Sequence, residues 1–309
     1  MSSQPLSVLA VFGPTGSGKS AIAEAVAERI PAELVSADSM QVYRGLPMLT
    51  NQPARATRLV GIWELDHFAS VGEYQVLAHE AIDAILERGK TPIVVGGTGL
   101  YLRAALADLE LPPPPSPGER ARWERLYDRL GPERAHSVLA DRDPAAAERV
   151  HPNDRRRVVR ALELAEAGLS LRPPSDRLWA EETRHPALVF GLDVPGEELD
   201  RRIEERTRAI FEAGVNEEVR RALAGTLSAT AEKVLGLREV AVLPREEAIA
   251  RVALRTRQYA AYQRKWMRRI PGLIRLAADR PSDEIADEIL EVARTRQRLP
   301  AHGRARADA

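Results

Sequence analysis

Short apolar runs alternate with segments of helical periodicity in the first part of the chain. The runs at 8–12, 33–37 and 91–95 are aliphatic and short, which is typical of buried strands. Residues 21–30 and 76–88 carry apolar side chains at helical spacing between them. Buried strands that alternate with helices are typical of a parallel, doubly wound sheet. We therefore predict an α/β fold with helices on both faces of a parallel sheet.

Two proline-rich segments, 111–117 and 172–176, interrupt this pattern. Between them, residues 119–168 are arginine-rich and helical in periodicity, and a new apolar run at 187–194 follows the second break. We predict a helical subdomain inserted into the α/β fold. The expected boundaries are a first core part at 1–111, the insertion at 112–184, a second core part with further helices at 185–275, and a C-terminal helix with a disordered tail at 276–309.

Composition narrows the classes of protein. The 309 residues include no cysteine, which excludes disulfides, thiol catalysis and cysteine-ligated zinc. The 45 basic and 45 acidic residues cancel, so only local clusters can indicate a nucleic-acid partner. No apolar run approaches the roughly 20 residues that span a bilayer, and the first residues lack the basic and apolar regions of a signal peptide. We expect no membrane association and a cytoplasmic location.

The first strand leads directly into a phosphate-binding motif. Residues 13–20 match G-x-x-x-x-G-K-[ST] in full, with a strand before them and a helix after them. Such a loop directs backbone N–H groups at phosphate oxygens, while its lysine adds a positive charge and its hydroxyl can bind Mg²⁺. The motif consists of Gly13, Pro14, Thr15, Gly16, Ser17, Gly18, Lys19 and Ser20.

Two further polar residues follow strand ends. Asp38 comes just after the second strand and Thr98 just after the third, and ligands gather at such carboxyl ends in parallel sheets. Asp38 could act as a general base or hold a metal, or it could cap the next short helix. An ordinary phosphate-loop NTPase has an acidic residue at the end of a neighbouring strand, whereas the strand at 91–95 runs into glycines. This difference argues against an ordinary NTPase.

Three motifs in order resemble one enzyme family. G-P-T-G-S-G-K-S at 13–20, S-A-D-S-M-Q-V-Y-R-G at 36–45 and V-G-G-T-G-L-Y-L at 95–102 are similar to the tRNA dimethylallyltransferase (isopentenyltransferase) family. The resemblance extends to H-P-N-D at 151–154 and G-L-R-E at 236–239, and it covers roughly 8–269. It implies a P-loop NTPase-like parallel sheet flanked by helices, with an inserted all-helical subdomain.

The resemblance implies prenyl transfer. Dimethylallyl diphosphate would donate its five-carbon group to N6 of the adenosine 3′ of the anticodon in tRNA, with release of pyrophosphate. Asp38 would accept the N6 proton, and Lys19 and Ser20, with Mg²⁺, would stabilise the leaving group. The expected donor site comprises Gly13, Pro14, Thr15, Gly16, Ser17, Gly18, Lys19, Ser20, Arg206 and Arg257.

The resemblance also implies contacts with the tRNA anticodon stem-loop. The target base would leave its stack to reach the crevice. The basic residues could equally form a solvated helix face. The chain has Arg156 where the family usually has glutamine. Because the family's mode of tRNA binding requires only one subunit, we expect a monomer. The expected tRNA-binding residues are Asp38, Ser39, Met40, Gln41, Thr98, Arg120, Arg155, Arg156, Arg157 and Arg160.

Three other functions use the same features. A small-molecule or nucleotide kinase shares the phosphate loop and often carries a helical insert. An adenylate prenyltransferase would share the donor site, but a free nucleotide does not need a broad basic surface. A non-catalytic RNA-binding protein would not need the intact Lys19, Ser20 and Asp38. The tRNA prenyltransferase is the function that the sequence favours.

Overall fold

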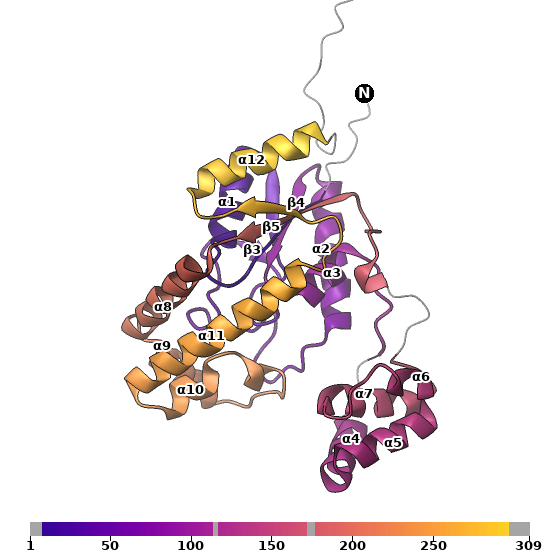
Figure 1. Cartoon of the computed structure of the whole chain (residues 1–309). Coiled ribbons are helices and arrows are strands. Elements are labelled where there is room, and N and C mark those ends of the chain that lie inside the picture. Colours follow the sequence, from indigo (N-terminus) through magenta and orange to yellow (C-terminus); the bar gives the residue numbers. More distant parts are fainter. Residues whose placement is uncertain (1–7, 114–116, 172–176, 297–309) are drawn as a thin grey trace, which may run out of the picture. The chain divides into compact units, whose positions relative to one another are not determined.

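The computed structural model describes residues 8–113, 117–171 and 177–296 (Figure 1). The chain forms two compact units: a core unit of Met1–Asp108 and Leu178–Ala309, and a helical unit of Leu109–Arg177. The sequence placed the insertion at 112–184. The proline-rich segments that suggested these limits lie partly (111–117) or wholly (172–176) outside the described residues, as does the tail that was expected to be disordered.

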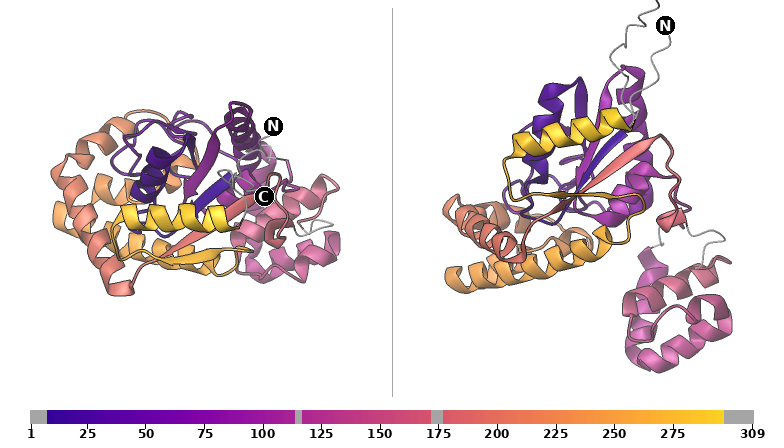
Figure 2. Two further views of the ribbon diagram at one scale, coloured as in Figure 1. Left: turned by 90° about the horizontal axis from the view of Figure 1, so that it is seen from above. Right: turned by 45° about the horizontal axis from the view of Figure 1, so that its top comes forward.

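A six-stranded, all-parallel sheet forms the centre of the core unit (Figure 2). This confirms the predicted α/β fold. Every residue of β1 is buried, because strands pair on both of its sides and helices cover both faces of the sheet. In the order β3-β2-β4-β1-β5-β6, the strands span Thr57–Arg58, Ala32–Ser36, Thr91–Gly96, Val8–Phe12, Ala187–Asp193 and Ile274–Ala277.

The two edge strands were not predicted. β3 has only two residues, paired with Leu34 and Val35, and β6 pairs with β5 at the other edge. Neither strand is long enough to show a period of two, which is the sequence signal for a strand. Helix α2 begins at Val71 rather than at 76, because the Ser70 side chain accepts a hydrogen bond from the Glu73 N–H at 3.2 Å and so caps an earlier turn.

Helices pack on both faces of the sheet. On one face, α1 contacts α12, and on the other α2 contacts α3 (Figure 1). The remaining helices follow β5, and α11 packs along α8. The helices of the core unit are α1 Lys19–Arg29, α2 Val71–Glu87, α3 Gly99–Leu106, α8 Gly196–Glu212, α9 Val215–Leu223, α10 Leu237–Val242, α11 Arg245–Met267 and α12 Ser282–Thr295.

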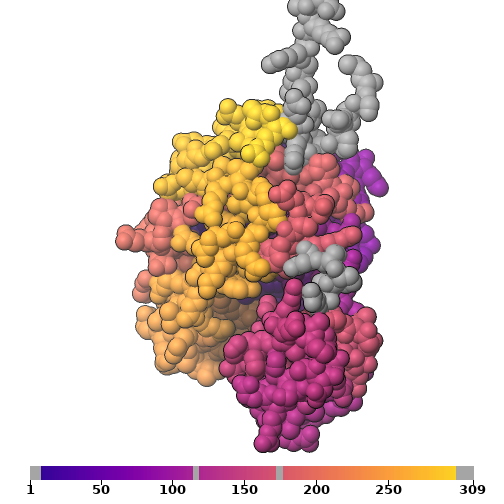
Figure 3. Space-filling view, turned by 45° about the vertical axis from the view of Figure 1, so that its right-hand side comes forward, coloured from indigo at the N-terminus to yellow at the C-terminus, as the bar shows by residue number. Residues whose placement is uncertain are grey.

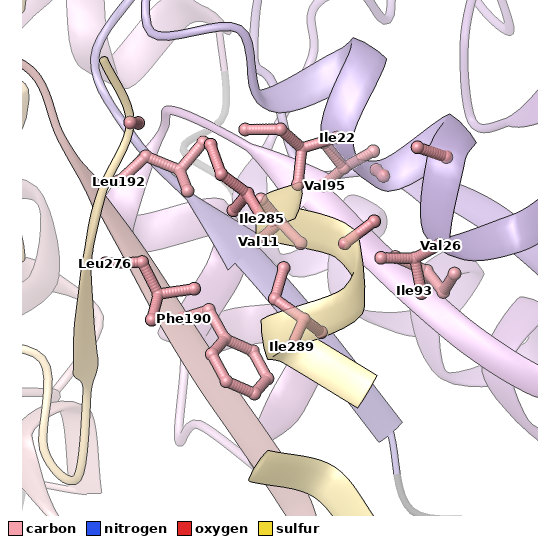
Figure 4. Close-up of a cluster of buried hydrophobic side chains, with 14 of the residues drawn as sticks. Val11, Ile22, Val26, Ile93, Val95, Phe190, Leu192, Leu276, Ile285 and Ile289 are labelled. Carbon is pink, nitrogen blue, oxygen red and sulfur yellow. The ribbon is translucent and has the colours of Figure 1, made fainter. Parts of the chain in front are cut away.

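The C-terminal helix completes the hydrophobic core. Ile285 and Ile289 of α12 point toward Val11, Phe190 and Leu276 of the sheet (Figure 4). Burying one isoleucine contributes about 1.5–3 kcal/mol, so α12 supports the strand that precedes the phosphate loop. In the space-filling view, the orange and yellow C-terminal segments of the core unit leave little of the indigo N-terminal part visible (Figure 3).

The helical unit has its own core. Trp123 and Tyr127 of α4 pack with Leu139 of α5 and with Val158 and Leu162 of α7. Its helices are α4 Pro117–Leu130, α5 Pro132–Arg142, α6 Pro144–Ala147 and α7 Arg155–Glu166. In neither unit does a described helix have the length and apolar character needed to cross a membrane.

The segment that returns from the helical unit is fastened to α3. Arg103 is almost fully buried, and its guanidinium donates to the carbonyls of Leu178 and Ala180 at 2.9 and 2.8 Å. Burial lowers the pKa of Arg103. The Arg184 N–H donates to the Leu106 carbonyl at 2.8 Å. The core unit therefore holds the returning segment at the end of the helix from which the chain left.

A buried carboxylate supports the long loop between β2 and β3. Glu218 of α9 accepts the N–H groups of Met48 and Leu49 at 2.9 and 2.8 Å and is 3% exposed. Glu218→Ala should lower the free energy of unfolding by about 3 kcal/mol, because one buried and one partly buried N–H group lose a charged acceptor. Urea unfolding measures this loss. Glu217→Ala on the exposed face of the same helix should cost less than about 1 kcal/mol, and equal losses would contradict the buried role.

Candidate active site

The phosphate loop joins β1 to α1 in a conformation that needs glycine. Gly16 and Gly18 both have φ of +83°, in the left-handed region that other residues rarely adopt. The Ser17 N–H donates to the Pro14 carbonyl at 3.1 Å, which closes the turn before the helix. The loop therefore presents its amides at the N-terminus of α1, where the helix dipole also favours an anion.

Lys19 occupies the first position of α1 and is partly buried. Burial lowers the pKa of Lys19, the positive charge of Arg206 lowers it further, and the negative charge of Asp38 opposes the shift. The charges of these three side chains therefore act on one another although they come from α1, α8 and the end of β2. An anion bound here would meet a cation that is poorly compensated by solvent.

Arg206 of α8 joins the phosphate loop directly. Its guanidinium donates to the Thr15 hydroxyl at 2.9 Å, and burial lowers its pKa. Arg257 of α11, the other arginine expected at the donor site, lies 3.9 Å from Glu204 of α8. The structure thus brings Arg206 to the loop, whereas Arg257 lies near a carboxylate of α8.

Asp38 and Thr98 meet at the carboxyl ends of β2 and β4. The Ser39 N–H donates to the Thr98 hydroxyl at 3.1 Å, and the two hydroxyls are 3.2 Å apart. The Asp38 carboxylate accepts the Met40 N–H at 2.9 Å. The alternative that Asp38 caps a short helix is wrong, since the carboxylate closes a turn and the next helix begins only at Val71.

Three tyrosines, two buried (Tyr74 and Tyr101) and one partly buried (Tyr259), lie near this carboxylate. Burial is the main cause that raises the pKa of Tyr74, Tyr101 and Tyr259, and the Asp38 charge contributes in all three. The Tyr259 hydroxyl lies 3.3 Å from the Thr98 hydroxyl, and the Tyr74 hydroxyl donates to the Ser36 carbonyl at 2.8 Å. The tyrosines therefore remain protonated at neutral pH, because each has a pKa raised above its ordinary value of 10.0.

The two residues that follow Ser39 differ in their exposure. Met40 is partly exposed, and Gln41 is buried. The Gln41 amide accepts the Ser36 hydroxyl at 2.9 Å and donates to the Asn51 carbonyl at 2.7 Å. Both ends of this amide are therefore used within the loop, and Gln41 supports the segment that carries Asp38.

Ser20 offers one ligand for a metal ion. Its side chain has no hydrogen-bond partner among the described residues, and it lines a small hollow with Lys19, Glu24 and Gln41. No group of three histidine, aspartate or glutamate side chains in the described ranges could hold a metal alone. This arrangement fits Mg²⁺, which keeps several waters and is held by one or two side chains together with substrate phosphates.

The helical unit contains the five arginines expected to contact RNA. Arg120 and Arg160 lie 4.0 and 3.1 Å from the buried carboxylate of Glu163, and Arg155 binds Asp128 through two hydrogen bonds of 2.8 Å. Arg156 and Arg157 are exposed at the N-terminus of α7, and Arg157 lies 3.6 Å from Asp154.

Positive charges in a first helical turn oppose the helix dipole at a cost of about 0.3–1 kcal/mol each. Arg156 has no ion-pair partner among the described residues, so nothing there offsets this cost. An exposed and uncompensated cation at this position, as Arg156 is, is more readily explained by a ligand than by stability.

Gln263 of α11 was not predicted as a site residue. Its side-chain amide contacts both the phosphate loop and the loop after β4. The sequence carries no local signal for this, because both partners lie far away along the chain.

Comparisons with known proteins place this geometry in a family. Residues 41–270 match the family model for IPP transferase. A relative from Anaeromyxobacter dehalogenans, named tRNA dimethylallyltransferase, is 40% identical, and the match covers 92% of this chain and 97% of the relative. A relative of the same name from Acidothermus cellulolyticus is 41% identical, and the match covers 94% of this chain and 92% of the relative. A crystal structure of a tRNA isopentenylpyrophosphate transferase from Bacillus halodurans has a TM-score of 0.67 at 28% identity, covering 94% of this chain and 97% of that one. This chain belongs to the IPP transferase family.

Proposed function

We propose that this protein transfers a dimethylallyl group from dimethylallyl diphosphate to N6 of the adenosine 3′ of the anticodon in tRNA, and releases pyrophosphate. One observation carries the proposal: the phosphate loop with Lys19 and the carboxylate of Asp38 lie near enough for their charges to interact, at the carboxyl ends of β1 and β2, in a member of the IPP transferase family. The relatives' name, tRNA dimethylallyltransferase, supports both the transferred group and the acceptor.

The donor side explains how the leaving group departs. The bond between the allylic carbon and the diphosphate oxygen breaks, and its electron pair leaves with pyrophosphate. The loop amides, Lys19 and Arg206 would stabilise the negative charge that develops there. Because Lys19 and Arg206 are partly buried, their charges act more strongly than they would at the surface.

The acceptor side explains how the amine becomes a nucleophile. The N6 lone pair of adenine is delocalised into the ring, so the amine attacks readily only if a base takes its proton. As the new N6–C bond forms, Asp38 would accept that proton. Thr98 holds the Ser39 N–H and thus the turn that carries Asp38, whose charge acts on Lys19 of the phosphate loop.

A bound Mg²⁺ would add charge neutralisation at the diphosphate. Ser20 would hold it together with donor oxygens. The monomeric state and the cytoplasmic location expected from the sequence stay predictions, and sedimentation of the purified protein would check the first.

The test is a reaction of the purified protein with Mg²⁺, dimethylallyl diphosphate and unmodified tRNA, followed by digestion and mass spectrometry of the nucleosides. A prenylated adenosine at the position 3′ of the anticodon is expected. Prenylation of free AMP without prenylation of tRNA would favour the adenylate prenyltransferase. Consumption of ATP with a small acceptor, and no prenylation, would favour the kinase.

Exposed cations on α7 are expected to contribute to RNA affinity. The double variant Arg156→Glu with Arg157→Glu should weaken tRNA binding about 10–100-fold at low salt and make the dependence on salt less steep by about 1–2 in log–log slope. Negative side chains are favourable near the N-terminus of a helix, so the double variant should keep the fold of the helical unit. Filter binding at several salt concentrations measures both quantities.

The matched control is Arg294→Glu with Arg296→Glu on the exposed C-terminal turn of α12, which changes the net charge equally. It should leave the affinity near that of the wild type. Equal weakening by both double variants would mean that overall charge, and not the α7 arginines, sets the affinity.

A further inference from the structure

Gln263 connects two loops that are far apart in the sequence. Its carbonyl oxygen Oε1 accepts the Thr15 N–H of the phosphate loop at 2.8 Å. Its amide nitrogen Nε2 donates to the Gly97 carbonyl, in the loop after β4, at 2.9 Å. The side chain is 1% exposed, so water cannot replace either bond.

The surrounding backbone is shaped around this side chain. A Cβ atom on Gly97 would lie 2.1 Å from Nε2 of Gln263 and 2.9 Å from the Gly13 carbonyl oxygen. A Cβ atom on Gly99 would lie 2.3 Å from the ring of Trp266, one helical turn after Gln263 on α11. No side chain fits between α11 and this loop, so the glycines admit the amide into direct contact with the backbone.

Each of the two loops carries one half of the proposed reaction. Thr15 also receives the hydrogen bond from Arg206, and thus belongs to the side that would bind the diphosphate. Gly97 precedes Thr98, which holds the turn containing Asp38 through the Ser39 N–H. The Gln263 amide is therefore a direct hydrogen-bonded link between the donor loop and the loop that positions the base.

We propose that Gln263 is a positioning residue that sets the distance between the donor diphosphate and the acceptor amine. The part of this inference that concerns the acceptor amine rests on the proposed function. An amide is suited to the task because it accepts at one end and donates at the other. A misplacement of about 1 Å between reacting groups can cost about 100-fold in rate.

Replacement of Gln263 tests the link. Gln263→Met keeps the length of the side chain and loses both hydrogen bonds. We expect its kcat for prenyl transfer to fall about 10–100-fold and its Kd for inorganic pyrophosphate to rise about fivefold or more, while the KM for tRNA stays within about twofold. Gln258→Met, on the exposed face of the same helix, is the control and should match the wild type.

Gln263→Glu separates positioning from simple loss of stability. The protonated carboxylic acid accepts and donates as the amide does, whereas the carboxylate cannot donate to the Gly97 carbonyl. Burial raises the pKa of a carboxyl group, so the kcat of Gln263→Glu relative to the wild type should recover as pH falls. The same ratio for Gln263→Met should stay flat with pH. If Gln263 had a purely structural role, its replacement would lower the unfolding temperature, and the kcat of Gln263→Glu relative to the wild type would not change with pH.

The outcomes distinguish the inference from the function on which it rests. If the wild type does not prenylate tRNA, the proposed function fails, and the pyrophosphate titration alone decides whether Gln263 holds the phosphate loop. If the wild type is active and both Gln263 variants keep kcat and pyrophosphate affinity within about twofold, the positioning role is overturned. If Gln263→Met does not fold, the pH profile of Gln263→Glu decides.

Discussion

Asp38→Ala is expected to lose prenyl transfer almost completely, with kcat lowered about 10²–10⁴-fold, because no other group would take the N6 proton. The affinity for tRNA should stay within about twofold, since one carboxylate contributes little to a surface dominated by phosphate contacts. Single-turnover transfer and filter binding measure the two quantities separately.

Asp38→Asn is the control for this variant. Its amide oxygen can still accept the Met40 N–H, so the turn should persist, but it cannot accept a proton. We expect kcat as low as in Asp38→Ala. An active Asp38→Asn enzyme, or an equal loss of transfer and tRNA binding in Asp38→Ala, would remove the general-base role.

Lys19→Ala is expected to lower kcat/KM for the donor about 10²–10³-fold, because the leaving diphosphate loses the cation closest to the helix N-terminus. Direct titration with pyrophosphate should show the weaker binding without any acceptor present. Lys90→Ala is the control: Lys90 precedes β4, at the other end of the sheet, and pairs with Glu33 at 3.1 Å. Unchanged donor kinetics in Lys19→Ala would remove the loop from the mechanism.

The same lysine predicts a pH dependence. Burial and Arg206 lower the pKa of Lys19 from its ordinary value of 10.5. The charged form binds the anion, so pyrophosphate affinity should fall as pH rises, and the fall should begin at a lower pH than for an exposed lysine. Lys19→Ala should lack this decline. Isothermal titration at several pH values measures it, and a wild-type affinity that is flat up to pH 10.5 would contradict the shift.

The sequence predicted the parts of the molecule whose signals are local. The phosphate loop and the three strands before 100 are contiguous patterns, and Asp38 and Thr98 follow directly from the ends of two of those strands. The edge strands β3 and β6 were not predicted, because two to four residues are too few to show the alternation of apolar and polar residues that indicates a strand. Their pairing depends on the neighbouring strands β2 and β5.

Contacts across the sequence could not be predicted. Gln263 reaches partners 248 and 166 residues away, and nothing in its neighbourhood distinguishes it from other polar residues of α11. Likewise, the arginine-rich segment predicted a basic surface, but Arg120, Arg155 and Arg160 lie against carboxylates that come from other turns or helices. Only the three-dimensional arrangement separates these arginines from the exposed Arg156 and Arg157.

Arg103 and Leu106 bind the returning segment through residues that belong to the core unit and not to the helical unit. The chain leaves the core unit after α3 and comes back to the same helix, so a short linker from Asp108 to Leu178 would close the gap without disturbing a strand. Evolution could lengthen, replace or remove such a module while the phosphate loop and Asp38 stay unchanged. The helical unit and the phosphate-loop core can thus diverge independently within one architecture.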